Sequence, residues 1–408
     1  MPSTPRPPTP RPPTPRPPTK ERLQLERVAV RGYRALEEVD VTLGPLNVII
    51  GPNGVGKSSF LDVFRFFSDA LGRREALGRL LSPRGGIGRL LTLGRRDSLE
   101  VEFFTRPPED LGGGPLHYEV EIQASGISYS IAREQLSQDR GQKKPFLFVT
   151  SDGRSSKVFS PIGRRLIAPE PPIPADELIL AQVPRALREA EWFRTAFGDI
   201  HFHPAIPVDD SAVVRRPQTL EPTALLVSPG GQNLFSVLYQ MRHEEPGWYE
   251  RILDVLRAAF SGFDRLEFPV VAGGQVTLAW YHRAYAGKPF YANELSAGTL
   301  RFLHLITLLL TPQAPTLILI DEPEDSLHPE LLRLVAELLL ETSERTQLLV
   351  ATQSPSLLRW LKPEHILVAD AQEGACTLTP GAGLDLDRWL AEYSLDRLWE
   401  IGQLGGRP

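Results

Sequence analysis

The 408-residue sequence predicts an α/β fold around a mixed, largely parallel β core. Three mainly apolar runs have the length of buried strands, and they span 46–50, 317–320 and 347–353. The first run is followed by the pattern G-x-x-x-x-G-K-S at 51–58 and by apolar residues at helical spacing over 60–67. A strand, a glycine-rich loop and a helix in this order form the context in which that pattern binds phosphate groups.

The glycine-rich loop is expected to bind the phosphates of ATP. Its glycines let the backbone curl so that successive N–H groups face an anion, and the helix that follows adds its positive end. We expect Lys57 to reach the β- and γ-phosphates and the Ser58 hydroxyl to ligate Mg²⁺. The residues predicted to line the phosphate site are Gly51, Pro52, Asn53, Gly54, Val55, Gly56, Lys57, Ser58 and Ser59.

Two acids, Asp321 and Glu322, follow the second apolar run. A carboxylate at the C-terminal end of a parallel strand lies in the crevice where ligands bind. We expect Asp321 to hold Mg²⁺ through water, and Glu322 to polarise the water that attacks the γ-phosphate. Gln353 ends the third run and is predicted to lie beside the γ-phosphate as a sensor. With Lys57, these residues form the predicted catalytic and metal-binding set.

A second anion cradle is predicted at Ser296 and Gly298, which precede an apolar helix at 302–310. One γ-phosphate cannot be surrounded by two distant cradles of the same chain. We therefore expect the second cradle to close over a nucleotide bound to another protomer, which predicts an ATP-dependent homodimer. The alternative is a capped helix without a ligand.

Composition narrows the class of protein. The hydrophobic content of 41% is ample for a packed core. The sequence contains no run of 18 apolar residues, so we expect no membrane span. The single cysteine, Cys376, excludes a disulfide framework and favours a cytoplasmic location. The net charge of −5 gives no global nucleic-acid signature, so any such surface must be a local patch.

The chain is predicted to have four parts. Residues 1–21 contain Thr-Pro-Arg-Pro-Pro three times in tandem and are expected to form a disordered basic tail, with a ligand for an aromatic groove or for phosphates as the alternative. Residues 22–229 form a first lobe with hairpins, 230–294 a helical lobe with strands, and 295–408 the remaining core. Within these parts we expect strands at 23–31, 39–43, 98–105, 116–124 and 127–132, a turn at Ser125-Gly126, a hairpin at 144–160, and helices at 175–197, 330–341 and 395–406.

Other polar residues have weaker assignments. Gln232 lies at the entrance to the helical lobe and is a candidate Mg²⁺ ligand, although a helix start after a glycine turn explains it as well. His201 and His203 should point to one face of a strand, and without a matching carboxylate we expect a structural pair rather than a metal site. Basic doublets, each either solvated or a DNA contact, occur at Arg95-Arg96, Arg164-Arg165 and Arg215-Arg216.

These motifs together resemble the AAA/ABC-type ATPases related to RecF, to structural-maintenance-of-chromosomes heads and to the OLD family. The resemblance rests on 51–58, 295–301, 319–329 and 351–355, and it covers about 22–408. It implies a P-loop NTPase fold with an ABC-type ATPase head: a mixed parallel β core, an antiparallel N-terminal sheet and a helical lobe. It also implies head-to-tail dimers with two composite sites. ABC-type relatives usually have His where this chain has Gln353, and an amide can donate a hydrogen bond but cannot carry a charge.

Three functions are compatible with the sequence. The resemblance implies an ATP-driven dimerising switch in DNA repair or antiphage defence, with DNA and a separate nuclease or effector chain as further partners, since about 55 residues after Gln353 leave no room for a nuclease domain. An ABC transport ATPase would have a far shorter gap between the phosphate loop and the second cradle. A slowly hydrolysing signalling or scaffold protein is the third alternative. A neighbouring nuclease or permease gene would separate the first two.

Overall fold

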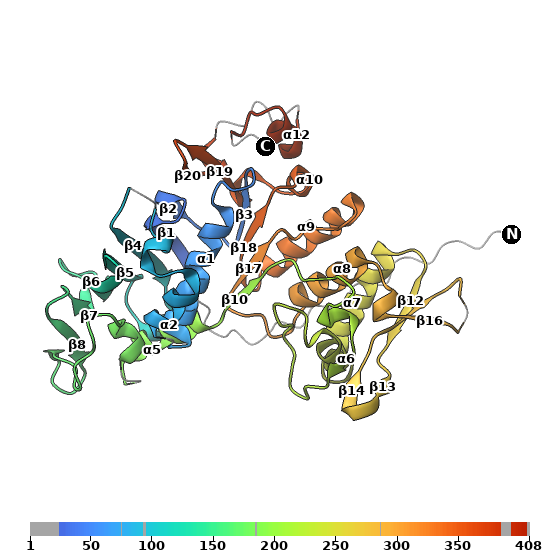
Figure 1. The fold of residues 1–408 in the computed structure, drawn as a ribbon, viewed down its shortest axis with the longest axis horizontal. Coiled ribbons are helices and arrows are strands. Elements are labelled where there is room, and N and C mark those ends of the chain that lie inside the picture. The colour runs from blue at the N-terminus through green and yellow to red at the C-terminus, as the bar shows by residue number, and fades with distance from the viewer. Residues whose placement is uncertain are drawn as a thin grey trace.

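A six-stranded sheet forms the centre of the computed structural model, which describes residues 24–74, 76–92, 95–183, 186–285, 287–384 and 393–405 (Figure 1). The predicted tail at 1–21 lies outside these residues. The strand order is β10-β17-β18-β3-β19-β20, parallel except for the last pair. The strands are β3 (Leu46–Ile50), β10 (Ile200–His203), β17 (Leu317–Asp321), β18 (Gln347–Thr352), β19 (Ile366–Gln372) and β20 (Ala375–Pro380). The predicted mixed, mainly parallel core is confirmed.

Helices cover both faces of this sheet. Leu317 and Leu319 of β17 join the core that includes α1 (Lys57–Phe67), whereas Ile318 and Ile320 join the core of α8 (Ala297–Leu309) and α9 (Pro329–Ser343). Because both faces are buried, the strands are apolar at successive positions rather than at alternate ones. The helices α1 and α8 therefore lie on opposite faces of the sheet.

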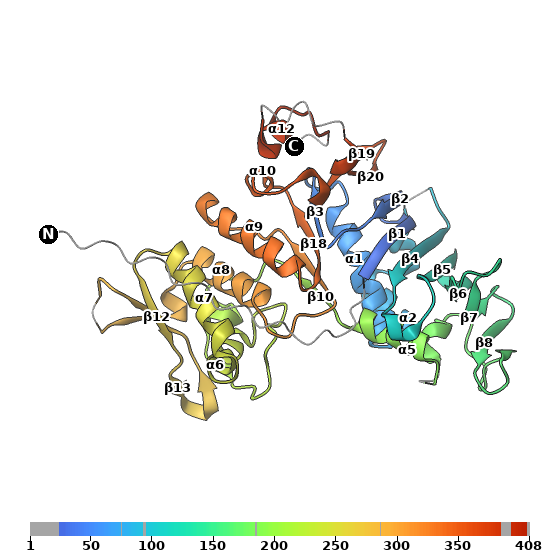
Figure 2. The same ribbon diagram turned by 180° about the vertical axis from the view of Figure 1, so that it is seen from behind.

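An eight-stranded antiparallel sheet extends from one side of the centre, in the order β2-β1-β4-β5-β6-β7-β8-β9. Its outer strands, β6 to β9, form the far end of an arm (Figures 1 and 2). The strands are β1 (Gln24–Tyr33), β2 (Leu36–Thr42), β4 (Ser98–Arg106), β5 (Leu116–Ser125), β6 (Ser128–Gln138), β7 (Phe146–Ser151), β8 (Ser156–Ser160) and β9 (Arg165–Ile167). Four helices lie between or after these strands in the sequence: α2 (Leu77–Leu81), α3 (Ile87–Leu90), α4 (Ile179–Gln182) and α5 (Arg188–Gly198). A short π-helix at Ser68–Gly72 directly follows α1.

A helical lobe lies on the other side of the central sheet, as Figures 1 and 2 both show. Its helices are α6 (Leu234–Glu244) and α7 (Pro246–Ala259), which pack with α8. Its small strands are β11 (Gln218–Thr219), β12 (Phe263–Glu267), β13 (Val270–Val271), β14 (Gln275–Val276), β15 (Ala279–His282) and β16 (Pro289–Tyr291). Near the C-terminus lie α10 (Pro355–Leu358) and α12 (Leu395–Glu400).

Two local predictions are wrong. The single helix expected at 175–197 is instead α4 and α5, because Val183 is extended at φ −58° and ψ 139°. Pro184 follows Val183 in the sequence, and proline disfavours the helical conformation of the residue before it. The turn expected at Ser125-Gly126 lies one residue later, since Ser125 pairs with Ser128 and Gly126 has φ +61°. Among the described residues, we find no helix long and apolar enough to cross a membrane.

Candidate nucleotide site

The phosphate loop lies between β3 and α1, at the C-terminal edge of the parallel sheet. Two of its residues have positive φ, +76° at Gly54 and +121° at Gly56, which favours glycine. At Gly51 a Cβ would lie 2.5 Å from the Ala369 carbonyl oxygen, so only glycine lets the loop approach β19 this closely. The glycines of the motif are therefore needed for the shape of this loop.

Lys57, the first residue of α1, is buried beneath the loop. Its Nζ donates hydrogen bonds to the carbonyl oxygens of Gly51 at 2.7 Å and Pro52 at 2.8 Å. Burial lowers the pKa of Lys57, and the carboxylates of Glu322, Asp321 and Glu324 act in the opposite direction. The ammonium thus has neutral carbonyl partners that a phosphate anion can replace, and nearby acids that offset part of the effect of burial on its pKa.

Asp321 ends β17 close to Ser58, whose hydroxyl favours the charged form of the Asp321 carboxyl. Its Oδ1 is buried and has no hydrogen-bond partner among the described residues. Burial raises the pKa of Asp321, against the effects of Ser58 and Lys57. An unsatisfied buried carboxylate oxygen next to a serine hydroxyl fits a hard divalent cation, since Mg²⁺ prefers oxygen ligands. The donor set therefore fits Mg²⁺.

Glu322 has a strained backbone, with φ +52°. Its N–H donates to the carbonyl oxygen of Ala351 on β18 at 2.8 Å, which holds the conformation in place. Burial, followed by repulsion from Glu324 and Asp321, raises the pKa of Glu322. Strain of this kind collects at functional sites, and a raised pKa makes a carboxylate a better proton acceptor.

Gln353 follows β18, and its side chain is exposed. Its backbone N–H donates to Glu324 Oε1 at 2.9 Å. Sequence reasoning missed Glu324, because an acid one residue beyond the Asp-Glu-Pro motif has no pattern that reveals its partner on another strand. The structure thus brings Lys57, Asp321, Glu322 and Gln353 to one edge of one sheet.

The second cradle is the N-terminus of α8. Ser296 caps this helix, with its Oγ accepting from the Thr299 N–H at 3.1 Å, and it is exposed. A Cβ on Gly298 would lie 2.5 Å from the Ser326 carbonyl oxygen, so glycine permits contact with the loop after β17. Arg301 reinforces this contact through an ion pair with Asp325 at 2.6 Å. Because α8 and α1 lie on opposite faces of the sheet, this cradle does not join the phosphate loop of its own chain.

Gln232 lies in the helical lobe, two residues before α6. Its Oε1 accepts a hydrogen bond from Ser228 Oγ at 2.7 Å, and we find no contact with Ser58 or Asp321 in the described part of the chain. The structure therefore does not bring Gln232 to the other predicted site residues, and its role in binding Mg²⁺ stays a prediction.

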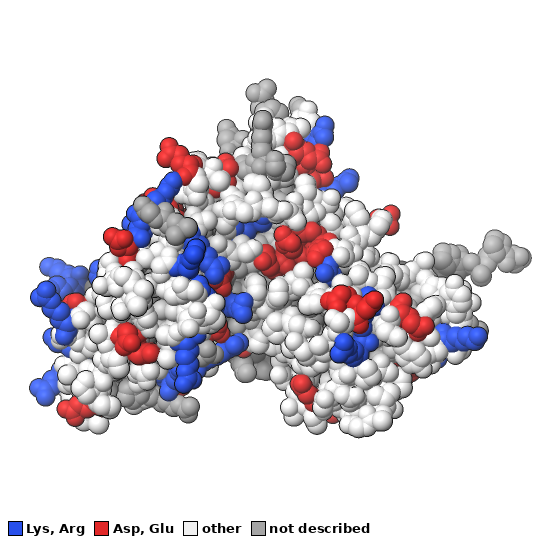
Figure 3. Space-filling view, in the orientation of Figure 1, with Lys and Arg blue, Asp and Glu red and all other residues white. Residues whose placement is uncertain are grey.

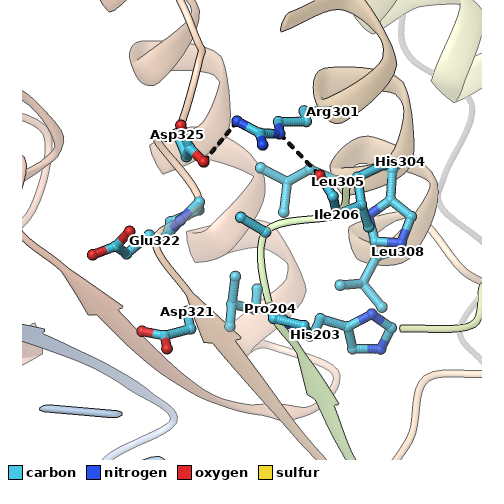
Figure 4. A pocket seen from close by; sticks show the side chains of 13 residues that line it. His203, Pro204, Ile206, Arg301, His304, Leu305, Leu308, Asp321, Glu322 and Asp325 are labelled. Atoms are coloured by element: carbon cyan, nitrogen blue, oxygen red, sulfur yellow. Dashed lines mark hydrogen bonds and ion pairs between the residues drawn. The ribbon is translucent and has the colours of Figure 1, made fainter. Parts of the chain in front are cut away.

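A small cavity of about 30 Å³ lies between the acids and α8 (Figure 4). Asp321 and Glu322 point away from its far end, where His203 approaches His304 with ring centroids 5.8 Å apart. Burial lowers the pKa of His203 and brings the pKa of His304 to about 4, so both rings are neutral. His201 lies on the same face, its ring 6.3 Å from that of His203. Neither ring nitrogen of the buried His203 has a hydrogen-bond partner among the described residues, so the structural pair that we expected is not satisfied by hydrogen bonds.

One other cluster has the composition of a metal site. Glu102, His117 and Glu119 lie together on the antiparallel sheet. However, Arg31 Nη1 lies 3.2 Å from Glu102 Oε1, and Arg133 forms an ion pair with Glu119. These arginines balance the negative charge of the two carboxylates, and we therefore assign no metal to the cluster.

Comparison with known proteins agrees with this geometry. The sequence model of the family described as "AAA domain, putative AbiEii toxin, Type IV TA system" matches residues 46–187 and 230–359. A 37-residue segment is 51% identical to OLD nuclease of Thermus scotoductus, and it spans 9% of this chain and 7% of that protein.

Solved structures share the fold. The SMC head bound to the C-terminal winged-helix domain of ScpA aligns with a TM-score of 0.53 and 13% identity over 87% of this chain and 97% of that chain. An SMC head with an extended coiled coil, bound to the C-terminal domain of ScpA derived from Pyrococcus furiosus, aligns with a TM-score of 0.50 and 12% identity over 93% and 99% of the two chains. The family match covers more than half of the sequence, and the chain therefore belongs to this AAA-domain family of P-loop ATPases.

Proposed function

We propose that the chain binds ATP with Mg²⁺ at the loop 51–59 and hydrolyses it. The observation that carries this proposal is the buried Oδ1 of Asp321, which has no hydrogen-bond partner among the described residues and lies near Ser58 and Lys57. A cation, an anion cradle and an unsatisfied metal ligand converge at one sheet edge, as phosphoryl transfer requires.

Each residue has a role that follows from its chemistry. When bound, Mg²⁺ would be held by Ser58 and Asp321 and would neutralise charge on the phosphates. Lys57 exchanges its two carbonyl partners for phosphate oxygens. Glu322 accepts a proton from the attacking water, and Gln353 donates a hydrogen bond that orients the γ-phosphate.

We propose further that ATP joins two chains. The exposed N-terminus of α8, with Ser296 and Gly298, lies on the face of the central sheet opposite α1. It can therefore reach a γ-phosphate only if that phosphate is bound to a second copy. A head-to-tail homodimer satisfies this condition for both sites at once.

The core proposal is tested by calorimetric titration of ATP with Mg²⁺ and by measurement of phosphate release. Lys57→Ala should abolish binding or turnover, because the phosphates lose their cation. Lys362→Ala is the matched control, since Lys362 is exposed and pairs only weakly with Glu364 at 3.7 Å. Unchanged hydrolysis in Lys57→Ala would refute the assignment of this site.

DNA is the proposed partner of the outer strands, which would suit a role in DNA repair or antiphage defence. Residues 127–167 contain eight Lys or Arg and three Asp or Glu, a net charge of +5 in a chain of −5. The loops after β6 and after β8 lie at the same end of the sheet, because the strands are antiparallel. Figure 3 shows basic side chains gathered over this arm and acidic ones near the centre of the same face. Six of these basic residues are exposed and make no ion pair with any described residue, and four of the six, Lys143, Lys144, Arg164 and Arg165, lie in or directly beside these two loops.

Fluorescence anisotropy with duplex DNA at several salt concentrations tests this partner. Replacing these four residues with Glu should weaken binding and reduce its salt dependence, because fewer counterions are released. Replacing Arg215 and Arg216 is the control, since Arg215 already donates to carbonyl oxygens of its own chain. Equal DNA binding by both variants would exclude this surface.

A further inference from the structure

Glu324 connects the loop after β17 to the end of β18. Its Oε1 accepts three hydrogen bonds, from Thr352 Oγ1 at 2.7 Å, Gln353 N at 2.9 Å and Ser354 N at 3.1 Å. Hydrogen bonds to a charged acceptor are roughly twice as strong as those between neutral groups. One carboxylate oxygen therefore fixes the backbone on both sides of Gln353.

This anchoring matters because Gln353 is an amide. A charged side chain interacts with phosphate over a range of positions, whereas a neutral hydrogen bond weakens steeply once distance and angle depart from the optimum. The side chain of Gln353 is exposed and makes no hydrogen bond with any described residue, so its direction depends on the backbone that Glu324 holds.

The other oxygen of the same carboxylate is also informative. Glu324 Oε2 is buried and has no hydrogen-bond partner among the described residues. Glu324 is also one of the carboxylates that act on Lys57. Leaving a buried carboxylate oxygen without a donor is costly, so a donor that arrives with the nucleotide would restore its hydrogen bonding.

We propose that Glu324 is a positioning residue for hydrolysis: Oε1 holds Gln353 in place, and Oε2 accepts a hydrogen bond from water that enters with the nucleotide. This inference rests on the proposed ATPase activity. It differs from a purely structural role, in which Glu324 would only cap the start of α10 and stabilise the fold.

A double-mutant cycle between Glu324→Ala and Gln353→Ala separates the two roles. If Glu324 acts through Gln353, Glu324→Ala should lower kcat about ten- to hundredfold with KM for ATP changed less than about threefold. In the Gln353→Ala background the same change should cost little more, because coupled residues are not additive. Glu324→Gln keeps an acceptor oxygen and should recover most of kcat. The matched control is Glu330→Ala, an exposed acid of α9.

Hydrogen exchange gives a readout that does not depend on turnover. The amides of Gln353 and Ser354 should exchange faster in Glu324→Ala than in the wild-type chain, and slowly in Glu324→Gln. A wild-type kcat in Glu324→Ala, fully additive effects in the cycle, or unchanged exchange of these two amides would each overturn the inference while leaving the ATPase assignment intact. A wild-type chain that does not hydrolyse ATP would overturn both.

Discussion

The two large sheets of this molecule differ in whether their charged side chains have partners within the chain. At the C-terminal edge of the parallel sheet, Asp321 Oδ1 and Glu324 Oε2 are buried without a hydrogen-bond partner among the described residues, and Glu322 has φ +52°. On the antiparallel sheet, charges are matched across strands: Arg31 pairs with Glu102, and Arg27 with Asp40. The first arrangement costs stability and leaves groups free for a ligand, whereas the second only supports the fold.

The cost at the parallel edge can be bounded. Each unsatisfied buried polar group costs about 1–3 kcal/mol, and a non-glycine residue at positive φ costs a similar amount. A ligand that satisfies these groups recovers part of this free energy, so ATP with Mg²⁺ should stabilise the chain. Substitutions at this edge should therefore change turnover more than stability, and substitutions in the antiparallel sheet should do the reverse.

Glu322→Gln should give the largest effect, a loss of about 10²–10⁴ in hydrolysis rate, because the amide keeps the shape but cannot accept a proton. ATP binding should persist, and the melting temperature should change little. Phosphate release and calorimetric titration measure the two properties separately. A variant that hydrolyses ATP at the wild-type rate would refute the role given to Glu322.

The dimer can be tested in that same background, where ATP is held uncleaved. Light scattering of Glu322→Gln with ATP should give twice the monomer mass, after the nucleotide-free mass has been measured. Adding Ser296→Arg should keep the protein monomeric and still able to bind ATP, because the exposed cap of α8 would be blocked. A parent that stays monomeric at saturating ATP would contradict the head-to-tail arrangement, and so would a double mutant that dimerises equally well.

The sequence predicted the parts of this site that are local. The phosphate loop and the acids after β17 lie within short motifs, and strand burial places them at one edge. Glu324 and Arg301 were missed because their partners, on β18 and in the loop after β17, come from other parts of the chain. The break between α4 and α5 did have a local signal, since Pro184 disfavours a helical conformation at Val183, but the apolar spacing of the region outweighed it.

The antiparallel sheet can be tested through Glu134, which should make the stability of the chain depend on pH. It is fully buried on β6, where its carboxylate accepts hydrogen bonds from the N–H groups of Ile179 and Leu180 and from Tyr118 Oη. Burial nevertheless raises the pKa of Glu134 from 4.5 to about 7. Between these pKa values the folded chain holds a proton that the unfolded chain releases, so the contribution of Glu134 to stability is greatest below about pH 4.5 and is lost as pH rises through about 7.

The size of this effect is about 3 kcal/mol for one group, at about 1.4 kcal/mol per pKa unit. Urea denaturation at several pH values should show this decline in the wild-type chain and a flatter profile in Glu134→Gln. The exposed Glu109→Gln is the control and should keep the wild-type profile. ATP turnover at a fixed pH should be the same in all three proteins. A wild-type slope in Glu134→Gln would show that another group is responsible.

The smallest effect is expected at the pair of Arg27 and Asp40, on the outer face of β1 and β2. Arg27 Nε donates to Asp40 Oδ1 at 2.7 Å, but the two side chains are 44% and 43% exposed. The hydrogen bond from Arg27 lowers the pKa of Asp40, so the pair stabilises the chain above the unfolded pKa of Asp40 and loses this contribution as pH falls. Water and salt screen such a pair, and exposed pairs contribute about 0.2–1 kcal/mol. Asp40→Asn should therefore lower the free energy of unfolding by less than about 1 kcal/mol near neutral pH, with a smaller difference at high salt and no change in ATP turnover. A loss of unfolding free energy comparable to that at Glu134 would mean that this face is not freely solvated but is covered in the functional assembly. The charges of the antiparallel sheet would then serve binding as well as folding, and the contrast between the two sheets would not hold at this pair.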